Sequence, residues 1–176
     1  GENAAGTSGS GHDPEATPAW LSIYDASDCA NPRLMAEVQW PENSHSVRVS
    51  PDGRFVYGTN LSPFTGKGGI QVMDISDMAH PRFLGKFGAT RSDGTTFGFA
   101  PHEVSFSADG RRVYAGVNAS LSDHLNQGIR IFPPNARALG PEGGGVFIFD
   151  NSDFIDRRPD PKLRLLSSVP GGGWHS

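Results

Sequence analysis

The sequence has a single cysteine and no long hydrophobic run, and neither sign of charge dominates it. Cys29 is the only cysteine among 176 residues, which excludes a disulfide within the chain. No stretch approaches the about 18 consecutive apolar residues that predict a membrane-spanning helix. With 15 basic and 19 acidic residues the net charge is -4, so the chain offers no broad attraction to nucleic acid or to an anionic membrane. We expect neither a nucleic-acid partner nor a membrane span.

Glycine and proline are frequent, at 23 and 14 residues, and the apolar residues come in short runs. This composition is typical of many short strands joined by tight turns, and it predicts an all-β chain. Residues 1–18 are rich in Gly, Ser, Ala and Pro and are expected to form a flexible leader. Such a segment suits the mature terminus of a processed, exported protein, which predicts a secreted or periplasmic location, although an engineered start would look much the same.

One repeated pattern joins two strands through a turn that is rich in aspartate. In each copy an alternating strand ends in Asp, Ser follows two residues later, and a second Asp comes next. A proline and a basic residue then precede another strand. The copies span 21–38, 70–87 and 146–169, and their first strands end in Asp25, Asp74 and Asp150. Asp and Ser side chains accept hydrogen bonds from nearby backbone N–H groups, so we expect this turn to join antiparallel strands.

A second repeat interlocks with the first. "HSVRVSPDGRFVYGTN" (45–60) and "HEVSFSADGRRVYAGVN" (102–118) share a histidine, an alternating apolar run, an Asp-Gly turn and a Val-Tyr pair. In "SPDG" the proline presets the first central dihedral of the turn, and the glycine takes a conformation that other residues resist. The alternation of Val47 with Val49, and of Val104 with Phe106, predicts half-buried strands.

Together the two hairpins give units of four antiparallel strands, and a repeated four-stranded unit is the signature of a β-propeller blade. We predict an all-β fold that is part of a β-propeller built from four-stranded antiparallel blades, with about two and a half blades in residues 19–176. The third and fourth strands of one blade occupy 20–40, complete blades occupy 45–88 and 102–169, and residues 174–176 begin the next innermost strand.

The pattern resembles the LVIVD-repeat and YVTN-type propellers, in which a "VSPDG" turn is followed by "RxVY" and then by a "VxVxD" strand. The resemblance covers about positions 20–176. The departures are the proline lost in "SADG" and the insertions at 89–100 and 119–144. The resemblance implies a propeller but no single activity, since such domains serve as scaffolds, binding modules and enzymes.

Closed propellers need typically 4 to 8 blades, more than these residues supply. We expect a second chain, from the same precursor, to complete the propeller. Assembly from further copies of this chain and a chain cut short when it was produced are the alternatives. The strands at 20–40 favour a second chain from the same precursor, because propellers often close when N-terminal strands complete a blade that the C-terminal end begins.

Three histidines occupy the same repeat position, at the start of the innermost strand, namely His45, His102 and His175. In the resembling families this strand lines the central axis, so the three rings are expected at one height around it. Imidazole is a common ligand of Fe, Cu and Zn, which predicts a transition-metal site with these three residues as ligands. Metal-free acid–base catalysis by the same residues and a purely structural hydrogen bond between blades are the alternatives. His80 is expected only to be a polar turn residue before proline.

The connections that carry the insertions at 61–68, 89–100 and 119–144 are expected on the same face as the histidines, and long loops over one end of a scaffold are where sites are usually built. The predicted ligand-binding residues on this face are Asn60, Arg91, Glu103, Asn118, His124 and Arg130. We therefore predict an exported propeller domain with a small-molecule site on its axis, with axial histidines that serve a metal-assisted enzyme. A non-catalytic binding or protein-interaction scaffold is the alternative.

Overall fold

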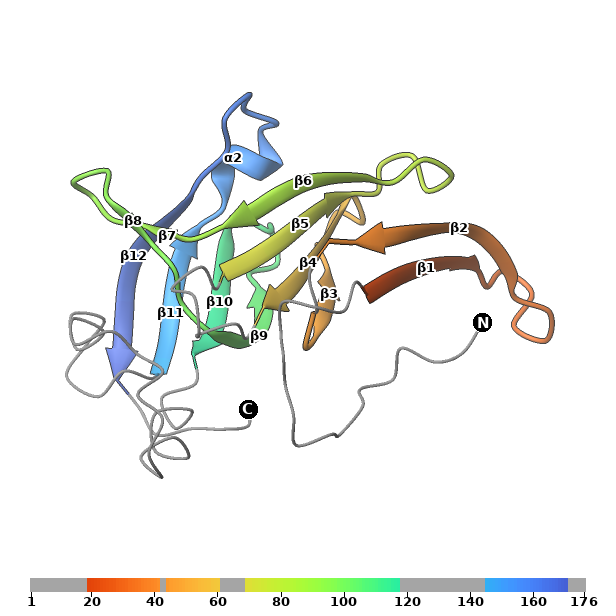
Figure 1. The fold of residues 1–176 in the computed structure, drawn as a ribbon, viewed down its shortest axis with the longest axis horizontal. Helices are drawn as coiled ribbons and strands as arrows, with labels where there is room; N and C mark the ends of the chain where they lie inside the picture. Colours follow the sequence, from red (N-terminus) through yellow and green to blue (C-terminus); the bar gives the residue numbers. More distant parts are fainter. Residues whose placement is uncertain (1–18, 42–43, 61–68, 118–144, 171–176) are drawn as a thin grey trace.

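The computed structural model describes residues 19–41, 44–60, 69–117 and 145–170, and their strands form three sheets that lie side by side (Figure 1). The first sheet pairs β1 (Ala19–Asp25) with β2 (Arg33–Trp40). The second has the order β3 (Val47–Val49), β4 (Phe55–Asn60), β5 (Gly69–Asp74) and β6 (Arg82–Phe87). The prediction of an all-β chain is confirmed.

The third sheet has six strands in the order β8-β7-β12-β11-β10-β9. Four of them repeat the plan of the second sheet, namely β9 (Pro101–Phe106), β10 (Arg112–Val117), β11 (Gly145–Asp150) and β12 (Leu163–Pro170). The remaining two, β7 (Ala89–Thr90) and β8 (Thr96–Phe97), come from the insertion at 89–100. β7 pairs with β12 in parallel, an addition that the sequence analysis did not predict.

The strand register repeats between the second and third sheets. Asp74 at the end of β5 pairs with Phe55, and Asp150 at the end of β11 pairs with Arg112. The next strand is antiparallel in both sheets and begins after the aspartate turn. The four-stranded antiparallel unit predicted from the two interlocking repeats is therefore present twice. Within the described residues these sheets do not close into a ring, and no helix there is long and apolar enough to cross a membrane.

The two Asp-Gly turns have the same hydrogen bonds. In the first, Ser50 Oγ donates to Asp52 Oδ1 at 2.6 Å and accepts from the Phe55 backbone N–H at 3.0 Å. The second repeats these bonds with Ser107, Asp109 and Arg112 at 2.6 and 2.9 Å. The turn glycines, Gly53 and Gly110, have φ of 72° and 71°, as the turn prediction requires. The first turn has Pro51 where the second has Ala108, yet both have the same hydrogen bonds and the same glycine φ. The side-chain hydrogen bonds therefore hold the turn without the proline.

The carboxylates of the aspartate turns accept backbone hydrogen bonds, as the sequence predicts. The carboxylates of Asp25, Asp74 and Asp150 accept the backbone N–H two residues on, at 2.9 to 3.0 Å. His80 lies in one of these turns, exposed, with its Nδ1 at 2.9 Å from Asp77 Oδ2. This placement fits the expectation of a turn residue.

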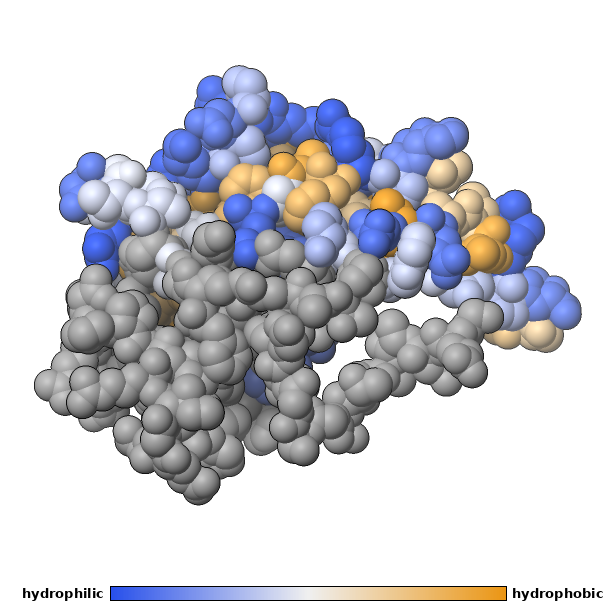
Figure 2. Space-filling view, viewed as in Figure 1, coloured by the Kyte–Doolittle hydropathy of each residue, from blue (hydrophilic) through white to orange (hydrophobic). Residues whose placement is uncertain are grey.

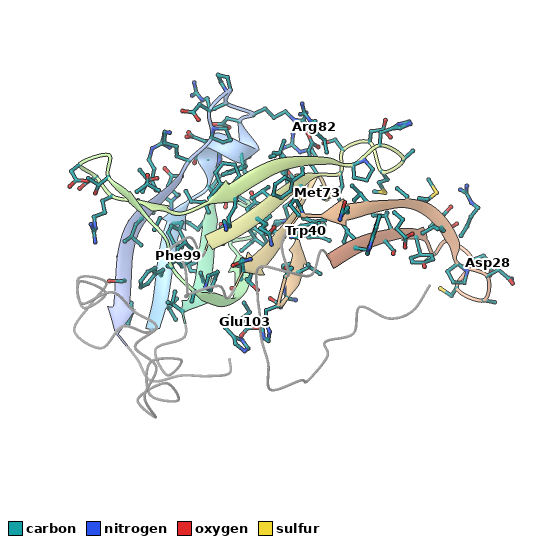
Figure 3. The ribbon with its side chains drawn as sticks, in the orientation of Figure 1. Asp28, Trp40, Met73, Arg82, Phe99 and Glu103 are labelled. Atoms are coloured by element: carbon teal, nitrogen blue, oxygen red, sulfur yellow. The ribbon has the colours of Figure 1, made fainter. Side chains whose placement is uncertain are left out.

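The sheets pack face against face through the residues that alternate along their strands. Leu21 and Ile23 of β1 pack against a cluster that contains Trp40, Val56 and Met73 and joins the first sheet to the second. Figure 3 shows Trp40 and Met73 between these two sheets. The first sheet thus buries one face against the second.

The larger core joins the second sheet to the third. Ile70 and Val72 of β5 share it with Phe147 and Phe149 of β11. Phe99, labelled in Figure 3, stacks at 5.2 Å from the Phe149 ring and belongs to the same core. The insertion at 89–100 therefore contributes to the core as well as to the surface.

The edge strand β3 of the second sheet is more exposed than its alternation predicts. Val47 and Val49 are each 52% exposed, whereas Val104 at the corresponding position of β9 is buried. The pattern indicates which residues share a face, but burial depends on whether another element covers that face. On the side viewed in Figure 2, hydrophobic surface lies over the β5–β6 region and toward the β1–β2 hairpin, with hydrophilic residues around it.

The connection between β11 and β12, residues 151–162, fastens the third sheet to the second. It contains the short helix α2 (Ser152–Ile155), whose Phe154 is buried against the Phe87 ring at 4.8 Å between centroids. Arg54 of the second sheet donates to the Ile155 carbonyl at 3.3 Å, and Arg157 lies 3.8 Å from the Asp74 carboxylate. The longer turn thus has a structural function that its length alone did not indicate.

Candidate functional site

Two of the three predicted histidines meet at the junction of the second and third sheets. His45 lies two residues before the edge strand β3, and His102 is the second residue of the edge strand β9. Their Nε2 atoms lie 3.0 Å apart, and their ring centroids lie 4.3 Å apart with an angle of 58° between the planes. The repeat therefore brings together the residues that share its register.

Two hydroxyl groups of the second sheet help to hold the histidines together, because they donate hydrogen bonds to the backbone of the third sheet. Ser46 Oγ and Thr59 Oγ1 donate to the His102 carbonyl at 3.1 and 3.0 Å. The backbone N–H of His45 donates to the Thr59 carbonyl at 2.8 Å, and Thr59 is fully buried. Hydrogen bonds to the main chain of both residues thus help to position the two imidazoles.

Thr59 and Ser46 were missed as positioning residues by the sequence analysis. Thr59 lies one residue before the predicted ligand Asn60, and its counterpart in the second repeat is Gly116. A threonine and a glycine at equivalent positions give no pattern to recognise. The signal that existed was Ser46 directly after the repeated histidine.

The spacing of the two nitrogens suits two kinds of chemistry. Two imidazoles bound to one metal ion at about 2.0–2.1 Å, with bond angles near 90 to 110°, place their nitrogens roughly 2.9 to 3.4 Å apart. A hydrogen bond between two neutral rings, one donating and one accepting, has a similar length. The separation of 3.0 Å between His45 and His102 fits either arrangement.

Two other predicted residues lie at the same end of the sheets as the histidines. Asn60 is the last residue of β4 and is buried beside Thr59. Glu103 follows His102 in β9, is half-buried and pairs in register with Gly116. Figure 3 shows Glu103 near the end of β9 where the strand begins. An amide and a carboxylate therefore accompany the imidazoles.

Arg91 is not brought to this site. It follows β7, which pairs with Leu163 and Arg164 at the start of β12, whereas His102 lies near the end of the sheet where Val117, Gly145 and Pro170 align. The strand order places β7 four strand spacings from β9, about 19 Å at 4.8 Å per strand. The strands β7 and β8 of the insertion at 89–100 lie along the β12 edge of the third sheet. The length of the insertion did not indicate that it would take this direction, away from the histidines.

The remaining predicted residues, His175, Asn118, His124 and Arg130, lie outside the described residues, as do the insertions at 61–68 and 119–144. Among the residues that the structure describes, no group of three or more His, Cys, Asp or Glu side chains is placed to hold a metal ion. The described part of the candidate site is therefore a histidine pair, with Asn60 and Glu103 at the same end of the sheets.

A buried hydrogen bond connects the same two sheets further from the histidines. Tyr57 of β4 donates to Asn151 Oδ1 at 3.0 Å, and the Asn151 amide donates to the Gly110 carbonyl at 2.9 Å. Burial raises the pKa of the Tyr57 phenol well above its usual range, against the opposing effect of the Asn151 bond. The phenol stays protonated under all ordinary conditions and acts as a fixed donor between the sheets.

Comparisons with known proteins identify no family. No family model matches the chain, and no curated protein matches it. A solved structure described as a hypothetical selenium-binding protein from Sulfolobus tokodaii aligns at 20% identity with a TM-score of 0.43. The alignment covers 84% of this chain and 33% of that chain, so the chain spans about a third of that protein's length. At this TM-score the likeness assigns neither a fold family nor a function.

Proposed function

We propose that this chain is part of a β-propeller, similar to the LVIVD-repeat and YVTN-type proteins, with a small-molecule site around its repeated histidines. The repeated four-stranded unit and the face-to-face packing of successive sheets support the propeller. A second chain or further copies supply the remaining blades. The Gly- and Ser-rich leader supports export to a secreted or periplasmic location.

The histidine pair is the single observation that carries the site. His45 and His102 come from different sheets, lie far apart in sequence and direct their Nε2 atoms to within 3.0 Å of each other. We propose that these two nitrogens, with His175 as a third ligand, bind a transition metal ion, either Fe, Cu or Zn. Three protein ligands with an open position are typical of catalytic metal sites.

The residues around the pair have distinct functions in this proposal. A bound metal would supply Lewis-acid or redox chemistry to a small molecule held on the axis. Ser46 and Thr59 hold the His102 backbone and so fix the angle between the two rings. Asn60 and Glu103 lie at the same end of the sheets, and in this proposal they orient a polar substrate. The proposal is therefore a metal-assisted enzyme.

The alternative is a binding or interaction scaffold in which the two imidazoles share a proton across the sheet junction. The direct contact between the rings supports it, because a hydrogen bond between neighbouring sheets needs no ligand. The two functions differ in what removal of one imidazole changes: metal uptake in the enzyme, and only stability in the scaffold.

Metal binding distinguishes them. The full chain and the variants His45→Ala, His102→Ala and His175→Ala are loaded separately with Cu(II), Zn(II) and Fe(II), dialysed and analysed for metal by mass spectrometry. The exposed His80 gives the matched control His80→Ala, since its ring lies in a turn with Asp77. We expect one metal per chain in the wild type and in His80→Ala, and at least about tenfold weaker binding in the other three.

Equal metal uptake by all variants, or none by the wild type, would contradict the metal site. In the scaffold alternative His45→Ala and His102→Ala lower the melting temperature of the metal-free protein, and added metal leaves every melting temperature unchanged.

A further inference from the structure

The outer faces of the first and third sheets carry exposed apolar side chains. On the third sheet Val146 of β11 pairs with Val169 of β12, and the two are 42% and 54% exposed. On the first sheet Tyr24 of β1 pairs with Leu34 of β2, and these are 55% and 49% exposed. Each pair forms a hydrophobic patch on a sheet face that no other described element covers, and such patches mark interaction sites.

The exposed faces of the first and third sheets are complementary in the same way as the sheet faces that pack against each other within the chain. On β1 the residues two and four positions before the aspartate, Ile23 and Leu21, pack toward the second sheet. The equivalent residues of β5, Val72 and Ile70, pack toward the third sheet. In both junctions the preceding sheet presents these even positions to the following sheet.

The following sheet presents the odd positions at each junction. Met73, one residue before Asp74, receives the first sheet, and Phe149, one residue before Asp150, receives the second. By the same count Val146 and Ile148 form an even-position face with no following sheet among the described residues. Tyr24 forms an odd-position face with no preceding sheet there.

We propose that the even-position face of the third sheet docks against the odd-position face of the first sheet of a second copy, head to tail. The occupant is a second copy because this chain carries both halves of the junction, which continues the two packed junctions within it. Exposed Trp20, on the same side of β1 as Tyr24, enlarges the receiving patch. This inference rests on the proposed repeat architecture.

A head-to-tail contact uses two different surfaces, so it leaves one free surface of each kind at the ends of any assembly. Such contacts generate a closed ring when the rotation between copies permits it and an open array otherwise. A symmetric contact would instead bury the same patch on both partners and stop at a dimer.

Sedimentation velocity of the full chain over a range of concentrations tests the proposal. We expect concentration-dependent association, and we expect Val169→Asp and Tyr24→Asp each to raise the dissociation constant at least about tenfold, since each buries an unpaired charge in the contact. Met78→Asp is the matched control, because Met78 is 49% exposed in the turn between β5 and β6 and lies on neither face. It should associate like the wild type.

Mixing the two defective variants gives the decisive result. Val169→Asp keeps an intact first-sheet face and Tyr24→Asp keeps an intact third-sheet face, so together they should form a one-to-one dimer and nothing larger. Separately each should stay monomeric. Circular dichroism and thermal melting of each variant confirm that it is folded.

Three outcomes would overturn the proposal: a wild-type chain that stays monomeric at every accessible concentration, association that is insensitive to both substitutions, or a mixture that fails to form the dimer. Loss of association in Val169→Asp alone would indicate a symmetric contact of the third sheet and would likewise overturn it. The metal content of the wild type is measured separately. Association without metal contradicts only the metal site, whereas a monomer that binds metal contradicts only the docking.

Discussion

Single residues at the turns decide whether the repeated hairpins close. Gly53 and Gly110 occupy equivalent turns with φ near +70°, a region that costs a side-chain-bearing residue about 1–2 kcal/mol. Their surroundings differ. A Cβ on Gly53 would meet nothing within 4 Å, whereas a Cβ on Gly110 would come within 3.1 Å of Ile155 Cδ1. The same backbone strain is therefore combined with a steric conflict in only one of the two repeats.

This difference predicts unequal effects of the same substitution. Gly53→Ala should lower the free energy of unfolding by about 1 kcal/mol, and Gly110→Ala by roughly 1 kcal/mol more, as Ile155 must move. Urea denaturation measures both. Gly116→Ala is the control, since its Cβ would lie 3.8 Å from Glu103 Cγ, an ordinary contact. Equal losses at positions 53 and 110 would show that Ile155 yields without cost.

Among the elements, the short helix α2 and the turn after it hold two sheets together. Phe154 is 1% exposed and packs edge-to-face with Phe55, Tyr57 and Phe87 at 4.8 to 6.4 Å between ring centroids. Those three rings all belong to the second sheet, whereas α2 follows β11 of the third. One side chain thus packs against three rings of the neighbouring sheet.

Phe154→Ala should therefore cost about 3–5 kcal/mol of unfolding free energy, the range for a buried aromatic residue. Met78→Ala removes a side chain of comparable size from an exposed turn and should change stability by less than about 0.5 kcal/mol. Thermal and urea denaturation of both variants provide the measurement. A small effect of Phe154→Ala would mean that the two sheets hold together without α2.

The elements also show what the sequence could and could not predict. The turns at Asp74 and Asp150 and the two Asp-Gly turns were predictable because their hydrogen bonds join residues close in sequence. The parallel pairing of β7 with β12 was not, because two residues carry no strand pattern and their partner lies far along the chain.

The candidate site was likewise predictable from the sequence only in part. The meeting of His45 and His102 followed from their shared repeat position, whereas the hydroxyl donors that fix them came from only one repeat. The place of Arg91 depended on the direction of an insertion, which length and composition do not encode.

For the whole molecule, the repeated aspartate carboxylates make the free energy of unfolding depend on pH in the acidic range. Burial acts to raise the pKa of Asp74, but hydrogen bonds from Ser76 and the nearby Arg157 outweigh it, so the pKa lies below its ordinary 3.8. The same balance, with Ser152 and Arg112, lowers the pKa of Asp150. Asp52 follows the pattern through Ser50 and Arg54. Each carboxylate is therefore more acidic in the folded chain than in the unfolded one.

The sign of the pH effect follows from these lowered values. Stability from these groups is fully present above the unfolded pKa of about 4 and is lost as the pH falls through the folded values, because the unfolded chain then binds more protons. The free energy of unfolding measured in urea should be steady between about pH 7 and 5 as regards these carboxylates and should fall below about pH 4. Asp74→Asn should make that fall shallower; an unchanged slope would remove Asp74 as a contributor.

The edge pairing of β7 also sets an order of folding during synthesis. Ala89 and Thr90 leave the ribosome long before Leu163 and Arg164, their partners on β12. The β1–β2 hairpin and the second sheet pair only strands that are neighbours in sequence, so they can form as soon as they emerge. The segment at 89–100 must wait, because closing so long a loop costs entropy before any contact compensates for it. Of the three described sheets, the third is therefore expected to be completed last, and the core that contains Phe99 to close with it.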